Sequence, residues 1–256
     1  MKKRGISTWI GVAVALVIAF VACTSLWNII KEKAEAENRI AIVIDDMGCD
    51  VSPVYEILSI DIPITLSILP SRPFSMEAAE KARKKGREII LHLPMEPRGY
   101  PEENPGEGCL YIRMSHEEIE KQLEEDIAAV PFISGVNNHM GSRFMEDEDR
   151  VETVLKQLKK KELFFLDSLT TRNSKGKRIA EKIGTKYIAR DVFIDNNRDF
   201  IETRERLIDI IEKKDRWKTL VLIGHPHTST IEAIRETVPL FRAEGIEVVT
   251  LSDLLN

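Results

Sequence analysis

The sequence is poor in cysteine, and this scarcity excludes two classes of protein. Its three cysteines, Cys23, Cys49 and Cys109, have neither the spacing of a zinc knuckle nor the number required for a dense disulfide framework. A single Cys49–Cys109 bridge in an oxidising compartment and two unpaired thiols remain as alternatives. The chain is therefore neither a disulfide scaffold nor a cysteine-ligated zinc module.

The chain also lacks a concentration of positive charge. Charged residues make up 31% of the sequence and the net charge is −5, with Lys and Arg interleaved among Asp and Glu. A nucleic-acid-binding protein would show a basic stripe or patch. We therefore expect no nucleic-acid partner.

Long hydrophobic runs are confined to the amino terminus. Basic residues 2–4 precede an apolar run over residues 6–30, which is long enough to cross a hydrocarbon core that requires about 20 residues. We interpret residues 1–30 as a signal-anchor or signal segment. The basic cluster predicts a cytoplasmic amino terminus and an exported domain on the extracytoplasmic side, in the periplasm or at the cell surface. A cleaved signal peptide is the alternative, and Phe20-Val21-Ala22-Cys23 loosely resembles a lipoprotein processing site.

Residues 31–38 are charged and read as a spacer, whereas residues 39–256 have the length of one α/β domain. Short apolar runs alternate there with amphipathic stretches, which predicts repeated βα units and a parallel sheet. Seven or eight strands favour a closed or nearly closed barrel over an open sheet. Expected strands cover residues 40–44, 64–69, 88–92, 133–137, 163–167, 187–192, 219–224 and 247–250. Expected helices cover residues 52–59, 75–85, 115–130, 147–161, 175–183, 203–214 and 230–243.

Two further local features are informative. Ser115 followed by Glu118 predicts a capping box at the start of the third helix. Residues 94–114 are rich in Pro, Gly and Glu, and a loop of this length inside a compact domain is usually functional or disordered. We expect this loop to form a lip over the site.

Most of the predicted strands end in side chains that bind metals or transfer protons. If the strands are parallel neighbours, these side chains meet at one edge of the sheet, as in β/α barrels. The polar endings are Asp45-Asp46, His92, Asn138-His139, Asp167, Arg190-Asp191 and His225. The sequence therefore predicts a convergent site.

Asp45 and Asp46 directly follow a buried strand. Adjacent carboxylates repel each other and are costly to desolvate unless a cation or hydrogen bonds compensate. A metal ion would compensate, with one carboxylate as its ligand and the other accepting a proton from a bound water. A helix cap combined with a turn aspartate is the alternative interpretation of the pair.

Several motifs resemble those of the NodB-like polysaccharide deacetylases, which are carbohydrate esterases with a distorted (β/α)7 barrel. The more specific resemblance is to the divergent polysaccharide deacetylase branch, and it covers essentially all of residues 39–256. The motifs are Ile44-Asp45-Asp46-Met47-Gly48, Gly86 to His92, Leu91-His92-Leu93-Pro94-Met95-Glu96-Pro97, Asn138-His139-Met140-Gly141-Ser142, Arg190 to Asp195 and Val221-Leu222-Ile223-Gly224-His225.

The resemblance implies that Asp45 is the catalytic base and that Asp46 and His92 are metal ligands. The family's second histidine would lie four residues after His92, but Glu96 stands there. We therefore expect His139 to complete the ligand set, with Glu96 as a weaker substitute and a structural histidine as the alternative for His139. Two imidazoles and one carboxylate suit a catalytic Zn²⁺, and iron, cobalt and manganese are compatible with the same ligands.

The remaining roles also follow from the resemblance. His225 would act as general acid and Asp167 would orient it, although Asp167-Ser168 is also compatible with a helix cap. Six residues would contact substrate or support the ligands: Glu96, Asn138, Ser168, Arg190, Asp191 and His227. A buried structural ion pair is the alternative interpretation of Arg190 and Asp191. A solvent-facing loop position is the alternative for His227.

These features predict a membrane-anchored, metal-dependent hydrolase that removes acetyl groups, held as amides or esters, from a cell-envelope glycan or oligosaccharide. The first alternative is a catalytically impaired glycan-binding or envelope-scaffolding protein on the same barrel. A second alternative is an amidohydrolase or phosphoesterase barrel, suggested by His225-Pro226-His227. Those folds normally place a His-x-His pair on the first strand and an aspartate late in the chain. In this sequence the aspartates come first and the His-x-His pair comes late.

Overall fold

The computed structural model describes residues 38–256 of the chain. The predicted anchor or signal segment, residues 1–30, lies outside the described residues, and so does the predicted spacer except for Asn38. Within the described part, no helix combines the length and apolar character needed to cross a membrane. The residues from Asn38 to Asn256 form one compact unit.

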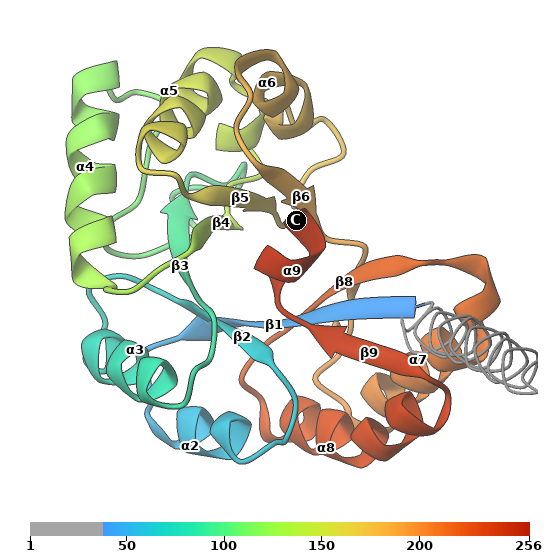
Figure 1. Ribbon diagram of the computed structural model, residues 1–256. Helices are drawn as coiled ribbons and strands as arrows, with labels where there is room; N and C mark the ends of the chain where they lie inside the picture. The colour runs from blue at the N-terminus through green and yellow to red at the C-terminus, as the bar shows by residue number, and fades with distance from the viewer. Residues whose placement is uncertain (1–37) are drawn as a thin grey trace, which may run out of the picture. The chain divides into compact units, whose positions relative to one another are not determined.

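A nine-stranded sheet, in which all pairs are parallel, forms the centre of residues 38–256 (Figure 1). The order of the strands is β6-β5-β4-β3-β2-β1-β8-β7, and β9 also pairs with β1. The strands are β1 (Asn38–Met47), β2 (Ile64–Ile68), β3 (Ile89–Met95), β4 (Gly135–Met140), β5 (Phe164–Asp167), β6 (Tyr187–Ala189), β7 (Val192–Phe193), β8 (Thr219–Gly224) and β9 (Ile246–Val249). The predicted parallel α/β fold is thereby confirmed.

The sheet is curled, because its two outermost strands belong to one continuous segment. β6 pairs with β5 through residues 187–189, and β7 pairs with β8 two residues further along the chain. The predicted strand over 187–192 is therefore two short strands separated by Arg190 and Asp191. This segment connects the two ends of the strand order, so the sheet is a curled half-barrel, and within residues 38–256 no pairing between β6 and β7 closes the barrel that the strand count favoured.

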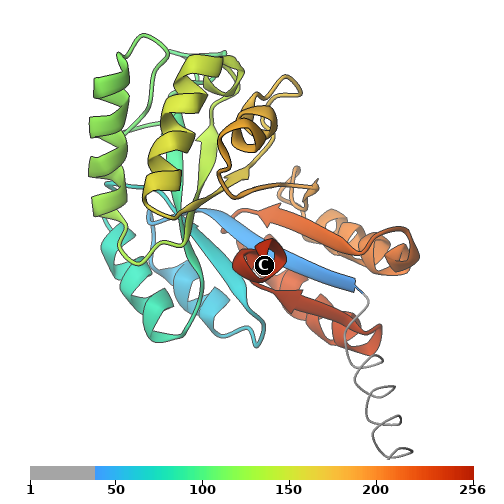
Figure 2. The same ribbon diagram turned by 45° about the horizontal axis from the view of Figure 1, so that its top comes forward.

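Except for α9, which lies within the curl of the sheet, the helices lie outside it (Figures 1 and 2). All seven predicted helices are present, and the short helix α9 was not predicted. Ser115 caps α4 through the expected capping box with Glu118. The helices are α2 (Ser52–Leu58), α3 (Ser75–Lys84), α4 (His116–Ala129), α5 (Glu148–Lys160), α6 (Gly176–Ile183), α7 (Phe200–Glu212), α8 (Thr228–Ala243) and α9 (Leu251–Leu255), with short 3₁₀ helices at Phe144–Glu146 and Lys214–Arg216.

Alternation along the strands assigns side chains to two faces. One buried cluster joins residues of β1, β3, β5 and β8, which are not all neighbours in the sheet, so it lies inside the curl. We call this side the inner face; its cluster is Ala41, Val43, Ile90, Phe164, Leu166, Val221, Ile223 and Leu251. The intervening residues, such as Ile42 and Phe165, pack in the larger cluster with the helices, on the outer face.

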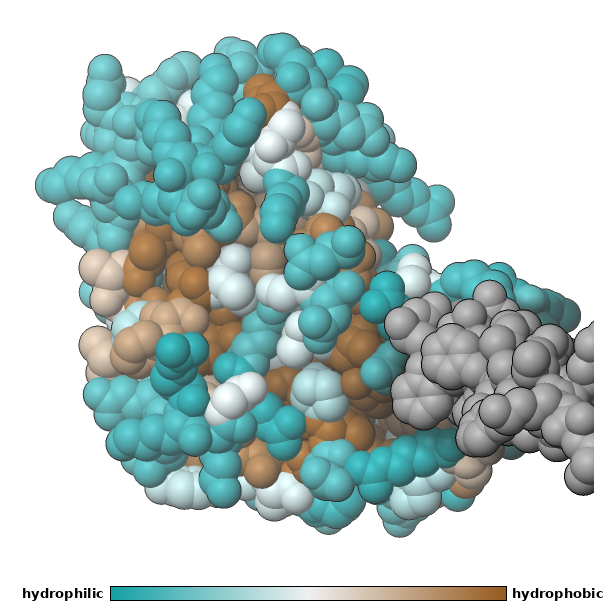
Figure 3. Space-filling view, in the orientation of Figure 1, coloured by the Kyte–Doolittle hydropathy of each residue, from teal (hydrophilic) through white to brown (hydrophobic). Residues whose placement is uncertain are grey.

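The amino-terminal end of the inner face is covered by α9. Glu88, just before β3, accepts hydrogen bonds from the backbone N–H groups of Leu251 and Ser252 at the start of this helix. On the face seen in Figure 1, apolar residues show in the middle, over the strands, and hydrophilic residues cover the rim (Figure 3). Because α9 covers the amino-terminal end of the strands, a site is expected at their carboxyl ends.

The long loop after β3 folds back along the end of that strand. Leu110 forms a parallel bridge with Met95, and its N–H donates to Pro94. Cys109 is buried in this loop and Cys49 is exposed, and both are free thiols. The alternative of a Cys49–Cys109 bridge is therefore not realised.

Asp126 of α4 is buried beneath this loop, and its environment leads to a stability prediction. Gly108 approaches it so closely that a Cβ there would lie 2.5 Å from Asp126 Oδ1. Burial raises the pKa of Asp126 to about 7, so the fold favours the protonated form and loses stability as the pH rises towards 7. We expect Asp126→Asn to gain on the order of 2 kcal/mol of unfolding free energy at pH 8 and little at pH 4. Denaturant unfolding at both pH values measures this gain, and Glu124→Gln, which changes an exposed acid on the same helix that does not contribute to the pKa of Asp126, should not reproduce it.

Candidate metal and acid–base site

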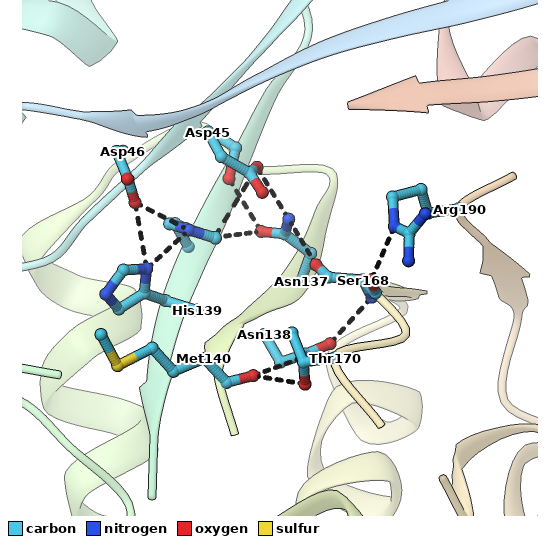
Figure 4. Close-up of polar contacts among 11 residues, drawn as sticks. Asp45, Asp46, Asn137, Asn138, His139, Met140, Ser168, Thr170 and Arg190 are labelled. Atoms are coloured by element: carbon cyan, nitrogen blue, oxygen red, sulfur yellow. Dashed lines mark hydrogen bonds and ion pairs between the residues drawn. The ribbon is translucent and has the colours of Figure 1, made fainter. Parts of the chain in front are cut away.

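Strand alternation carries the polar strand endings onto the inner face. Asp45 follows Val43 by two residues, His92 follows Ile90 and His225 follows Ile223. Each therefore points to the same side as its apolar predecessor. Residues from β1, β3 and β4 meet there at the carboxyl end of the sheet (Figure 4).

Asp46 is turned toward the histidines by an irregularity of β1. The pairing of β1 with β2 shifts between Ile44 and Met47, and Asp46 has a φ of 56°, in the left-handed region. Its Oδ1 lies 3.1 Å from His92 Nε2 and 3.0 Å from His139 Nδ1. These two ring nitrogens are 3.0 Å apart. The three side chains predicted as metal ligands thus meet at one point.

The three ligand atoms suit a small divalent cation. Tetrahedral zinc with bonds of about 2.0–2.1 Å requires ligand atoms roughly 3.3–3.4 Å apart, close to the spacing observed here. Asp46 Oδ1 is buried yet accepts no hydrogen bond of good geometry, as expected of an atom directed at a cation. Burial opposes ionisation of Asp46, but His139 and His92 hold its pKa far below the ordinary value, so it is an anionic ligand. Burial also lowers the pKa of His139, which favours the neutral ligating imidazole.

Asn137 joins the ligand set to Asp45, a role that the sequence reasoning missed. His92 Nδ1 donates to Asn137 Oδ1 at 2.8 Å, which directs Nε2 toward the other ligand atoms. Asn137 Nδ2 donates to Asp45 Oδ1 at 2.8 Å and to Ser168 Oγ at 3.2 Å. Ser67 Oγ donates to Asn137 Oδ1. The sequence did contain a signal for this role, because Asn137 lies two residues before His139 and therefore on the same face of β4.

We expect Asn137→Ala to weaken metal binding about 10- to 100-fold, because His92 Nδ1 and Asp45 Oδ1 both lose their partner. The measurement is metal affinity by competition with a chelator of known strength. Ser67→Ala removes only one contact to Asn137 and should have a much smaller effect. Equal affinities in Asn137→Ala and the wild type would contradict the positioning role of Asn137.

His225 is held by Asp195, and here the structure differs from the prediction for Asp167. His225 Nδ1 donates to Asp195 Oδ1 at 3.0 Å, and the His225 N–H donates to Asp195 Oδ2. Thr230 Oγ1 donates to the same carboxylate oxygen. Burial alone would lower the pKa of His225, but Asp195, with the charges of Asp45 and Asp46, raises it to about 9. His225 is therefore a protonated imidazolium near neutral pH.

Asp167 cannot take this position, because it lies on the opposite face of its strand. It follows Leu166 of the inner cluster by one residue, so its side chain points to the outer face. Its carboxylate accepts hydrogen bonds there from Ser174 Oγ, Tyr187 OH and the Leu169 N–H. Asp167 therefore organises the loop after β5.

Asn138 and Ser168 tie the ends of β4 and β5 together. Asn138 Oδ1 accepts from the Ser168 N–H at 2.9 Å, and Asn138 Nδ2 donates to the carbonyl of Met140 (Figure 4). Both residues are buried. They support the end of β4, the strand that carries His139 and Asn137.

Arg190 and Asp191 do not form the buried ion pair considered above. The Arg190 guanidinium donates to the carbonyls of Ser168 and Leu169 and lies 3.8 Å from the ring centroid of Phe193. Asp191 is exposed, and its carboxylate accepts from the Val221 N–H of β8. Both residues therefore stabilise the segment that joins β6 to β7.

Glu96 and His227 lie at the borders of the site. The buried Glu96 carboxylate accepts from the Ile112 N–H and from Arg143, so its oxygens are engaged in the loop after β3. His227 precedes α8, and its ring stacks on that of His225 with centroids 6.0 Å apart. Asp195, His225 and His227 could also hold a cation, but Asp195 already accepts three hydrogen bonds. The cluster of Asp46, His92 and His139 is the better candidate.

An Asp-His-His cluster and a His–Asp pair at the carboxyl end of a curled parallel sheet are typical of metal-dependent hydrolases. The family model of the divergent polysaccharide deacetylases matches residues 42–255, and the chain belongs to this family. The resemblance of the sequence motifs is thereby confirmed. The chain is 33% identical over 241 residues to protein YibQ of Escherichia coli (strain K12), covering 94% of this chain and 73% of that protein.

Solved structures share the fold. The crystal structure of protein ATU2773 from Agrobacterium tumefaciens C58 has a TM-score of 0.80 at 27% identity, covering 85% of this chain and 89% of that one. The catalytic domain of peptidoglycan N-acetylglucosamine deacetylase from Eubacterium rectale ATCC 33656 has a TM-score of 0.51 at 14% identity, covering 84% of this chain and 88% of that one. The second likeness concerns the fold alone.

Proposed function

We propose that this protein is a metal-dependent hydrolase that removes acetyl groups from a cell-envelope glycan or oligosaccharide. The observation that carries the proposal is the meeting of Asp46, His92 and His139, whose ligand atoms lie within 3.1 Å of one another. Asp45 and His225 lie on the same inner face and could act as base and acid. Family membership supports acetylated glycans as the substrate class.

Asp46, His92 and His139 would hold the cation, and their ligand types suit Zn²⁺. A divalent cation in such a site lowers the pKa of water and polarises the acyl carbonyl. Asn137 would maintain the orientation of His92.

Asp45 would remove the proton from the attacking water. Its Oδ1 is held by Asn137, and no hydrogen bond to its Oδ2 is present among residues 38–256, so this oxygen is free to accept a proton. His225 would protonate the leaving amine or alkoxide through Nε2, because its Nδ1 is bound to Asp195. Its raised pKa keeps this proton available at neutral pH.

The location is part of the same proposal. The basic residues 2–4 and the apolar run over residues 6–30 support an exported protein that is anchored in the membrane with residues 39–256 on the extracytoplasmic side. Envelope glycans are accessible on that side of the membrane.

Acetate release tests the proposal directly. The purified full-length protein is stripped with a chelator, reloaded with Zn²⁺ and incubated with acetylated oligosaccharides. We expect acetate release that disappears on stripping and returns on reloading. Binding of these oligosaccharides without acetate release, whichever divalent metal is supplied, would contradict a hydrolase and favour the glycan-binding or scaffolding alternative.

A further inference from the structure

A polar hollow lies beside the candidate site and has no role in the scheme above. Its volume is about 420 Å³, and the loops after β3, β4 and β5 contribute to its walls. The lining residues are Arg98, Ser142, Thr170, Thr171, Arg172 and Asn173.

The hollow adjoins the end of β4, the strand that carries His139. Ser142 lies three residues after this ligand, so their Cα atoms are at most about 11 Å apart. Thr170 Oγ1 donates to the carbonyl of Met140, the residue next to His139 (Figure 4). A sugar chain with one unit at the metal cluster could therefore place a neighbouring unit in the hollow.

The charge in the hollow is positive and only partly balanced. Two arginines line it and no acidic residue does. Arg98 is paired with Glu146, whose carboxylate oxygens lie 2.6 and 2.7 Å from Arg98 Nη2, and Thr171 also donates to this carboxylate. Arg172 is exposed and makes no side-chain ion pair or hydrogen bond within residues 38–256. Its guanidinium is the unbalanced positive charge.

We propose that this hollow is a subsite for a sugar unit that carries a carboxylate, next to the acetylated unit at the metal cluster. The guanidinium of Arg172 presents paired N–H donors that match the two oxygens of a carboxylate. The hydroxyl of Ser142 and the amide of Asn173 supply donors and acceptors for sugar hydroxyls, whereas the Thr170 hydroxyl is already bound to Met140 and Asn138. This inference rests on the proposed function and specifies its substrate class as an acidic acetylated glycan.

Calorimetric titration of the full-length protein with three oligosaccharides of equal length tests the subsite. The first is a neutral N-acetylglucosamine oligomer, the second carries a lactyl ether carboxylate on alternate units, and the third is an acetylated uronic acid oligomer. We expect one of the two acidic oligomers to bind about tenfold more tightly than the neutral one, and its identity gives the source of the carboxylate. Arg172→Gln should abolish the preference and leave binding of the neutral oligomer within about twofold of the wild type.

Arg216→Gln is the matched control, because it removes the same charge from an exposed position just before β8, at the opposite end of the strands. It should keep the preference for the acidic oligomer. No preference in the wild type, or a preference that survives Arg172→Gln, would overturn the subsite. A preference that depends on Arg172 without acetate release would support the subsite and remove the hydrolase proposal. Acetate release with equal kcat/KM for neutral and acidic oligomers would support the hydrolase proposal and overturn the subsite.

Discussion

The Asp45→Asn variant is expected to lose about three orders of magnitude in kcat, which lies within the range for removal of a general base. The amide has almost the same shape as the carboxylate, and its oxygen can still accept from Asn137 Nδ2, but it cannot take a proton from water. Asp45 lies outside the ligand cluster, with its Oδ1 3.7 Å from His92 Nδ1. The variant should therefore retain its metal.

Acetate release at saturating substrate and metal content, measured on the same preparation, check this expectation. Asp50→Asn is the matched control, because it makes the same change at an exposed position five residues further along the chain. An Asp45→Asn variant with wild-type kcat would contradict the role of base. A loss of metal in parallel with kcat would instead make Asp45 part of the metal site.

The second large effect concerns the pH dependence of kcat/KM. His225 must be protonated to act as an acid, and Asp195 is the main group that raises the pKa of His225 to about 9. The wild-type rate should therefore fall as the pH rises through 9. In Asp195→Asn the pKa of His225 falls toward the ordinary histidine value, so the alkaline limb should move down by about 2 units. Activity at pH 8 should then fall about 10-fold or more, whereas activity at pH 6 should change little.

Complete pH profiles of kcat/KM for Asp195→Asn and Asp167→Asn show which carboxylate is the partner of His225. Asp195 is the partner in the structure, and Asp167 is the one that the sequence predicted. Asp167→Asn loses a carboxylate on the outer face, so it should keep the alkaline limb of the wild type even if its stability falls. A shift of the limb in Asp167→Asn, or its absence in Asp195→Asn, would contradict the His225–Asp195 pairing.

The sequence was sufficient for features that depend on local patterns. Apolar runs located the strands, and their polar endings located the carboxyl-end site, because parallel strands bring these endings to one edge. The choice between Asp167 and Asp195 depends on which face each side chain occupies. Asp167 is one residue after Leu166, which points inward, and this alternation was already present in the sequence. Applying this alternation to residues 164–167 would have placed the Asp167 side chain on the outer face.

Other features required three-dimensional coordinates. Asp195 follows a segment that pairs with β5 at one end and with β8 at the other, and no sequence period signals such a division. The left-handed backbone of Asp46, which turns its carboxylate toward His92, is an uncommon conformation for a residue other than glycine. Asn137 acquires its role from contacts with residues of four other strands or strand ends, which are remote in sequence.

Elemental analysis of the purified protein tests the central claim most directly, namely that Asp46, His92 and His139 bind one cation together. The wild type and His227→Ala should carry the same amount of divalent metal after dialysis, and His139→Ala should carry almost none. His227→Ala controls for the second cluster of acidic and histidine side chains, formed by Asp195, His225 and His227. Full metal content in His139→Ala, or metal that is lost in His227→Ala instead, would contradict the account.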